Sequence, residues 1–161
     1  MFPSKTRELA IKLLDLCRER SWHLATAESC TGGLICGALT AIPGSSDVVD
    51  RGFVTYTNEA KSEMIGVPSH LFETVGAVSE EVACAMVEGV RQKTTVEVAL
   101  SVTGVAGPGA SERKPAGLVY IGCAVTGKPT IVKECHFPGD RDSVRQQTVD
   151  EAIGLALEQL D

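Results

Sequence analysis

The sequence is poor in aromatic side chains, in positive charge and in histidine. Only 4% of its 161 residues are Phe, Trp or Tyr, so the core has to be built from aliphatic side chains. Fifteen Lys and Arg residues stand against 21 Asp and Glu residues, which gives a net charge of −6. General binding to nucleic acid or to an anionic membrane needs a basic face, so this balance argues against both. It leaves room for a small anionic ligand held by a few well-placed cations.

Long apolar runs and paired cysteines are also missing. No stretch approaches the roughly 20 apolar residues of a membrane span, and residues 1–4 lead into a charged helix without a signal-peptide core. The six cysteines include no CxxC pair and no metal-ligand spacing. Most of them lie inside apolar runs, where a free thiol behaves as a small hydrophobe. We therefore expect a cytoplasmic protein with reduced thiols and no bound metal.

Helical and strand patterns alternate through the chain, which is long enough for one domain over residues 1–161. Four main helices are expected over residues 4–20, 34–41, 80–92 and 141–160, with a short helix over 59–65. Strands are expected over 22–27, 51–56, 96–102, 117–125 and 130–137. The run 96–102 is almost continuously aliphatic, which is typical of a strand covered on both faces. A turn over 126–129 joins the last two strands into a hairpin. The pattern predicts an α/β fold, a three-layer α/β/α sandwich with a mixed sheet of about five strands.

Residues 26–33 (TAESCTGG) form the most informative segment, between the first strand and the second helix. They place hydroxyls and a thiol at a helix N-terminus, where free N–H groups and the helix dipole attract anions. Glycines there allow a ligand to approach the backbone. The residues expected to serve this site are Ser29, Cys30, Thr31, Gly32 and Gly33. Two alternatives stay open: a plain capping serine, and Cys30 as either the nucleophile or a packed thiol.

A nucleophilic serine needs a base. None of the three histidines neighbours a glycine-rich turn in the sequence, so a Ser-His-Asp triad is disfavoured unless tertiary contact brings His136 close. Residues 56–61 run from a strand end into the first turn of a helix, which directs Tyr56 and Lys61 toward a cleft above the sheet, with Asn58 between them. A desolvated lysine loses its proton readily and serves as a general base. The alternative is a solvated lysine on a short amphipathic helix.

Two later segments also predict ligand contacts. Residues 103–109 follow the buried strand, at the end where open α/β sheets bind ligands, and they contribute Thr103, Gly104 and Gly107. This segment is neither GxGxxG nor a P-loop, and a plain Gly/Pro loop is an equal alternative. Arg141 and Arg145 lie at i, i+4 near the start of the last helix, which suits a phosphate or carboxylate. Their alternative is surface pairing with neighbouring aspartates.

Several blocks carry a family resemblance: residues 26–33, 44–46, 51–56 with 58–61, 76–79, 101–109 and 138–141. In this order they resemble the CinA C-terminal domain family, over essentially the whole chain. Characterised members are nicotinamide mononucleotide amidohydrolases, and larger relatives carry an additional N-terminal domain with pyrophosphatase activity, which is not implied here. The resemblance implies hydrolysis of nicotinamide mononucleotide to nicotinic acid mononucleotide and ammonia, without a cofactor or metal.

The resemblance also implies roles for individual residues. Ser29 would be the nucleophile, with Tyr56 and Lys61 as proton-transfer partners. Thr103 would hydrogen-bond near the scissile amide. Arg141 or Arg145, together with the glycine-rich loop, would hold the pyridine nucleotide.

Residues 110–114 match no motif that we can assign. Two other functions stay open: a non-catalytic nucleotide-binding or regulatory module of the same fold, and an amidase that depends on Cys30. A homo-oligomer with a subunit boundary near the glycine-rich segments is also compatible with the sequence.

Overall fold

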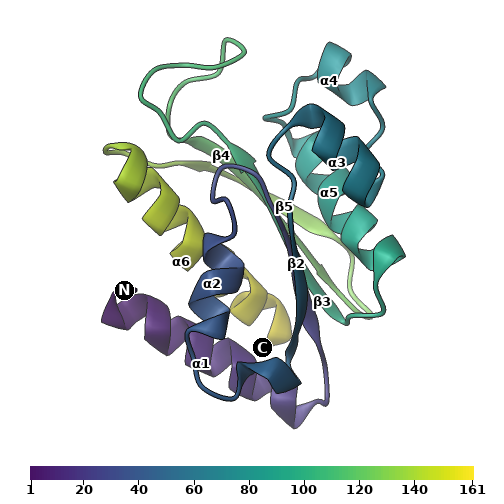
Figure 1. The fold of residues 1–161 in the computed structure, drawn as a ribbon, viewed down its shortest axis with the longest axis vertical. Coiled ribbons are helices and arrows are strands. Elements are labelled where there is room, and N and C mark those ends of the chain that lie inside the picture. The colour runs from purple at the N-terminus through teal and green to yellow at the C-terminus, as the bar shows by residue number, and fades with distance from the viewer.

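Aliphatic strands and amphipathic helices assemble into three layers in a computed structural model that describes residues 1–161 (Figure 1). The strands are β1 (Leu24–Glu28), β2 (Val49–Val54), β3 (Val98–Gly104), β4 (Leu118–Val125) and β5 (Ile131–His136). They form one sheet in the order β2-β1-β3-β4-β5. β1 pairs in parallel with β2 and β3, whereas β4 is antiparallel to both β3 and β5. The predicted mixed five-stranded sheet is confirmed.

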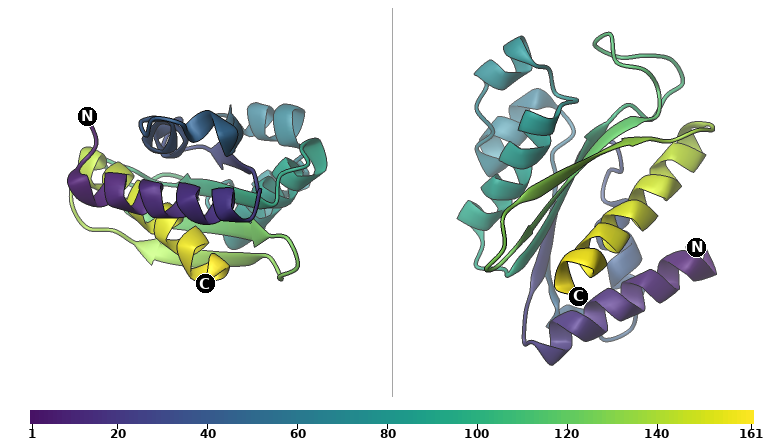
Figure 2. Two further views of the ribbon diagram at one scale, coloured as in Figure 1. Left: turned by 90° about the horizontal axis from the view of Figure 1, so that it is seen from below. Right: turned by 180° about the vertical axis from the view of Figure 1, so that it is seen from behind.

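Helices cover both faces of the sheet (Figure 2). They are α1 (Ser4–Glu19), α2 (Leu34–Thr40), α3 (Asn58–Ile65), α4 (His70–Thr74), α5 (Glu80–Lys93) and α6 (Arg141–Leu160), with a 3-10 turn at Ser45–Asp47. α1, α2 and α6 pack together on one face, and α5 lies on the other with α3 and α4 against it. Thr57, Ser79 and Asp140 cap α3, α5 and α6 by accepting a hydrogen bond from a first-turn N–H. The α/β/α sandwich predicted from the sequence is therefore confirmed.

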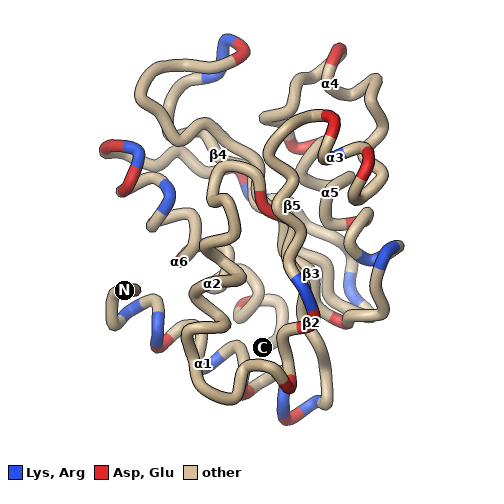
Figure 3. Tube along the Cα trace, viewed as in Figure 1, with Lys and Arg blue, Asp and Glu red and all other residues tan.

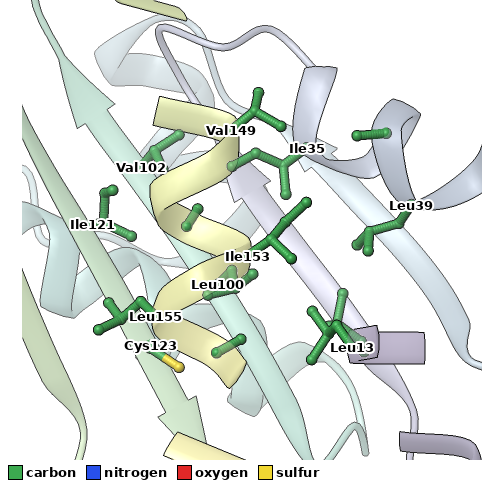
Figure 4. Close-up of a cluster of buried hydrophobic side chains, with 14 of the residues drawn as sticks. Leu13, Ile35, Leu39, Leu100, Val102, Ile121, Cys123, Val149, Ile153 and Leu155 are labelled. Carbon is green, nitrogen blue, oxygen red and sulfur yellow. The ribbon is translucent and has the colours of Figure 1, made fainter. Parts of the chain in front are cut away.

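The core is aliphatic, as the shortage of aromatic residues predicts. A cluster of 26 buried residues fills the space between the sheet and α1, α2 and α6, and none of them is aromatic (Figure 4). A second cluster of ten lies under α5. β3 is buried along its length up to Thr103, which confirms the prediction of a strand covered on both faces. No helix is long and apolar enough to span a membrane.

The topology sets the position of the site. The parallel strands β1, β2 and β3 end at the same edge of the sheet, and their following segments lead into α2, into α3 and into the loop between β3 and β4. Figure 3 shows acidic and basic segments side by side at the tip of that loop and at the start of α6. The strand predicted over 51–56 is β2, which begins and ends two residues earlier. The pairing of β2 with β1 ends where Val54 lies opposite Glu28, so Tyr56 lies in the connection from β2 to α3.

Candidate active site

A cavity of about 320 Å³ lies at the ends of the parallel strands. Its walls come from the turn after β1, the β2–α3 connection, the loop between β3 and β4, and the start of α6. The sequence-predicted residues that line it are Ser29, Cys30, Tyr56, Asn58, Lys61, Thr103, Gly104, Gly107 and Arg141. Four others, Thr31, Gly32, Gly33 and Arg145, lie outside its lining.

Ser29 and Lys61 meet inside this cavity. Ser29 directly follows β1, and its N–H donates to the carbonyl of Val102 in β3 (3.1 Å), which fixes the turn to the sheet. Lys61 lies in the first turns of α3, and its Nζ is hydrogen-bonded to Ser29 Oγ at 3.0 Å. Lys61 Nζ also donates to the main-chain oxygen of Tyr56 at 3.3 Å. Two segments 32 residues apart thus bring a hydroxyl and an amine into direct contact.

Lys61 is buried without a counter-ion. It is 1% exposed, and no carboxylate forms an ion pair with it. Burial lowers the pKa of Lys61, while the negative charges of Glu112 and Glu59 offset part of that shift. A lower pKa leaves more of the amine neutral near pH 7, and only the neutral amine can accept a proton. The pair can therefore act as a nucleophile and its base.

Glu28 corrects the prediction of an anion site at the start of α2. Its carboxylate is 1% exposed and turns back onto the helix. It accepts hydrogen bonds from the N–H groups of Ile35 (2.9 Å) and Cys36 (3.0 Å) and from two threonine hydroxyls, Thr26 (3.1 Å) and Thr31 (2.7 Å). A ligand cannot reach N–H groups that an internal carboxylate already occupies. The expectation that this helix end attracts an external anion was wrong.

The two arginines have different surroundings. Arg145 Nε and Nη2 donate to the carbonyls of Cys30 (3.1 Å) and Thr31 (3.2 Å), so its guanidinium holds the turn from outside the cavity. Arg141 lines the cavity, where Nη1 donates to the Gly107 carbonyl (2.6 Å) and Nη2 to the Tyr56 hydroxyl (3.3 Å). Neither arginine forms an ion pair with a neighbouring aspartate. Of the two, only Arg141 is placed to contact a ligand in the cavity.

Cys30 lines the cavity but is poorly suited to ionise. It is buried, and burial raises the pKa of its thiol to about 11. The guanidinium of Arg145 and the amine of Lys61 offset this only in part. No histidine lines the cavity, and His136 is hydrogen-bonded to Glu134 on the exposed surface of β5. These surroundings favour Ser29 over Cys30 as the nucleophile.

The outer wall contains residues to which the sequence analysis gave no role in the site. Ala77 and Val78 lie before α5, and the Thr103 hydroxyl donates to the Ala77 carbonyl (2.8 Å). Glu112 comes from the unassigned segment 110–114, and its Oε2 accepts from the Ala77 N–H (3.0 Å). The only signal for Glu112 in the sequence was its position as a carboxylate in the loop that follows a ligand-binding strand end. No group of three or more His, Cys, Asp or Glu side chains is arranged to hold a metal ion.

The fold and the site together define a class of protein: a three-layer α/β/α domain with a serine and a buried lysine in one cavity at its parallel strand ends. The family model described as the CinA C-terminal domain matches residues 6–160, and the chain belongs to that family. The resemblance seen in the sequence is thus confirmed.

Individual relatives agree with this assignment. The chain is 42% identical over 158 residues to a protein from Enterobacter agglomerans named nicotinamide-nucleotide amidohydrolase PncC, covering 98% of this chain and 96% of that protein. It is 51% identical over 139 residues to a CinA-like protein from Syntrophobacter fumaroxidans, covering 86% of this chain but 32% of that protein. The chain thus spans about a third of the length of several curated relatives that it matches.

Solved structures show the same fold at full length. The crystal structure of the competence/damage inducible protein CihA from Agrobacterium tumefaciens superposes with a TM-score of 0.94 at 42% identity, covering 99% of this chain and 98% of that one. A competence damage-inducible protein A from Klebsiella pneumoniae gives a TM-score of 0.93 at 34% identity, covering 96% of both chains. The fold therefore occurs elsewhere as a chain of this size.

Proposed function

We propose that the protein is an amidohydrolase that converts nicotinamide mononucleotide to nicotinic acid mononucleotide and ammonia. The observation that carries the proposal is the 3.0 Å contact between Lys61 Nζ and Ser29 Oγ in a cavity where the lysine has no counter-ion. Acyl transfer requires a nucleophile next to its base, and this contact supplies both. The substrate is suggested by the name of the relative from Enterobacter agglomerans, a nicotinamide-nucleotide amidohydrolase.

In the first half of the reaction, Ser29 Oγ attacks the carboxamide carbon while neutral Lys61 takes the hydroxyl proton. The tetrahedral intermediate then collapses, the C–N bond breaks, and the leaving nitrogen takes up a proton and departs as ammonia. In the second half, water attacks the resulting nicotinoyl ester and gives a proton to Lys61. The ester bond breaks, and Ser29 recovers its proton from Lys61. Atoms and charge balance without any further reactant.

The developing oxyanion needs N–H donors that are fixed in place before the reaction. The N–H of Cys30 follows the nucleophile in the chain, and the protein supplies no main-chain acceptor for it. The peptide group that carries the Cys30 N–H also contains the Ser29 carbonyl, which accepts from the Gly32 N–H at 3.0 Å, and this contact orients it. Arg145 donates to the carbonyls of Cys30 and Thr31, which fixes the next two peptide groups of the turn. We assign the Cys30 N–H as an oxyanion donor and Arg145 as a positioning residue. The Gly32 N–H is not available as an oxyanion donor because it donates to the Ser29 carbonyl.

Tyr56 and Arg141 complete the proposal at the mouth of the cavity. The Tyr56 hydroxyl relays the proton from Lys61 toward the leaving nitrogen. Arg141 uses one nitrogen for the Gly107 carbonyl and one for Tyr56, and a guanidinium has five N–H donors in all. The remaining donors suit the 5′-phosphate. Asn58 and Thr103 line the same cavity as further polar contacts.

The test is release of ammonia from nicotinamide mononucleotide by the purified protein, measured in a coupled assay. Wild type should release ammonia, and Ser29→Ala should reduce kcat by at least about 1,000-fold because the nucleophile is lost. Retained turnover in Ser29→Ala would overturn the mechanism. Tight binding of the nucleotide by wild type without release of ammonia would instead identify a binding module.

A further inference from the structure

The cavity contains a single carboxylate. Its lining includes two cationic side chains, Lys61 and Arg141, and one acidic side chain, Glu112. The mechanism uses both cations and gives Glu112 no role. An acidic group in a cavity that otherwise suits an anion is unfavourable for anion binding, so its presence there needs a physical reason.

Glu112 is held in place by the loop around it. Its Oε2 accepts from the N–H of Ala77 at 3.0 Å, and two residues later Lys114 Nζ donates to the carbonyl of Val78 at 2.6 Å. Both contacts tie the loop to the segment before α5. The other carboxylate oxygen, Oε1, has no hydrogen-bond partner within the protein. Glu112 thus presents a positioned oxygen whose hydrogen-bonding capacity is free.

The hydrogen bond to Ala77 does not require a charge at this position. A glutamine could accept from the same N–H through its amide oxygen. A negative charge matters only if something positive lies nearby. The charge of Glu112 does act on Lys61, but it raises the pKa of that amine and so opposes the neutral form that the mechanism needs. The positive group that Glu112 complements is therefore to be sought in the ligand.

We propose that Glu112 is a specificity-determining residue that selects ligands with a cationic ring. This inference rests on the proposed function. A nicotinamide mononucleotide carries a permanent positive charge on its pyridinium ring and negative charge on its phosphate. With Arg141 at the phosphate and Glu112 facing the ring, the cavity offers opposite charge to both parts of this zwitterion. A nucleotide with a neutral ring gains nothing from Glu112.

The experiment compares two ligands of nearly the same shape. Nicotinamide mononucleotide has a cationic ring, whereas its reduced dihydronicotinamide form has a neutral one and keeps the carboxamide, ribose and phosphate. Binding is measured by calorimetry in a Ser29→Ala background, so that no turnover occurs. Glu112→Gln should weaken binding of the oxidised nucleotide about 5-fold, as expected for a partly exposed charge pair, and leave binding of the reduced form unchanged.

Two control variants separate charge recognition from other effects. Glu59→Gln also removes a negative charge that acts on Lys61, but Glu59 does not line the cavity, so the ratio of the two affinities should stay at the wild-type value. Lys114→Met loosens the loop without changing the charge of Glu112, so it should weaken the binding of both nucleotides by the same factor.

The outcomes distinguish the inference from the proposed function. Equal weakening of both ligands in Glu112→Gln would show a purely structural role, and an unchanged ratio with unchanged affinities would show no role in binding. Either result overturns the inference while leaving the proposed function intact if wild type releases ammonia. Failure of the nucleotide to bind and of wild type to release ammonia would remove both.

Discussion

Glu28 and Lys61 are equally buried, each 1% exposed, but their surroundings are opposite. Glu28 accepts hydrogen bonds from two main-chain N–H groups and two hydroxyls, so each carboxylate oxygen has two donors. Lys61 meets one hydroxyl oxygen and one carbonyl oxygen and has no carboxylate partner. One buried charge is fully compensated within the protein, and the other is not.

This difference separates a structural charge from a reactive one. A buried charge with complete hydrogen bonding stabilises the local fold, and here it closes the N-terminus of α2 behind the turn that carries Ser29. A buried amine without a counter-ion is costly as an ammonium and so favours its neutral form. The site therefore combines a rigid support under the nucleophile with a base that is poised to take a proton.

The largest expected effect comes from removing the uncompensated charge. Lys61→Met should reduce ammonia release by at least about 100-fold, a typical loss for a general base. The same variant should keep or raise the free energy of unfolding, because an apolar side chain of similar length replaces a buried amine. Ammonia release and urea denaturation measure the two effects on one protein.

The matched control is Lys12→Met, because Lys12 is exposed on α1 and far from the cavity lining. Lys12→Met should leave the rate of ammonia release and the free energy of unfolding close to the wild-type values. A loss of several kcal/mol of stability in Lys61→Met would break the comparison, since the amine would then be a structural charge like Glu28.

The compensated charge should behave in the opposite way. Glu28→Gln keeps the shape of the side chain, but in either orientation its NH₂ group faces a main-chain N–H, of Ile35 or of Cys36, that can only donate. We expect the free energy of unfolding to fall by about 2–3 kcal/mol, the usual cost of leaving buried polar groups unpaired. Urea denaturation measures this, with the exposed Glu8→Gln on α1 as the matched control. A stability equal to wild type would show that the carboxylate is dispensable.

The pH dependence sharpens the comparison further. Burial lowers the pKa of Lys61, so kcat/KM should rise with pH as the amine loses its proton, and this rise should occur below the usual pH range for a lysine.

Stability should depend on the same proton. The folded protein binds the proton of Lys61 less tightly than the unfolded chain does. Lys61 therefore makes the protein less stable below its folded pKa, and the free energy of unfolding rises with pH between the folded and unfolded values.

Glu59→Gln provides an internal check on this assignment. The charge of Glu59 raises the pKa of Lys61, so its removal should shift the rise in kcat/KM to lower pH without changing the plateau. Lys61→Met should lack the part of the pH dependence of stability that Lys61 contributes. A pH profile that stays in place in Glu59→Gln would assign the titration to another group.

The periodicity of the sequence predicts most of the fold and part of the site, but not the role of Glu28. The aliphatic run of β3 and the stripe of α5 predict buried elements because packing there depends only on periodicity. The approach of Ser29 to Lys61 follows from two parallel strands ending at one edge of the sheet. The role of Glu28 was missed because its carboxylate reaches N–H groups seven and eight residues ahead, outside any capping motif.

Glu112 was missed for a different reason. Its position depends on a loop in which Glu112 and Arg113 adopt positive φ values of 51° and 66°. Glutamate and arginine rarely adopt this conformation, so the sequence does not predict it. The segment before α5 holds this loop in place through side-chain contacts to main-chain atoms. Contacts of this kind between distant segments have no periodic signature in a sequence.

The smallest expected effect concerns the neighbour of the nucleophile. Cys30→Ala should change kcat by less than about 3-fold, because a buried thiol with a pKa of about 11 is almost entirely protonated at neutral pH and its main-chain N–H is kept. The ammonia assay compares it directly with Ser29→Ala. If Cys30→Ala were inactive and Ser29→Ala retained activity, the thiol would be the nucleophile. Lys61 would then take its proton from Cys30, and the hydrogen bond between Lys61 and Ser29 would have no catalytic role.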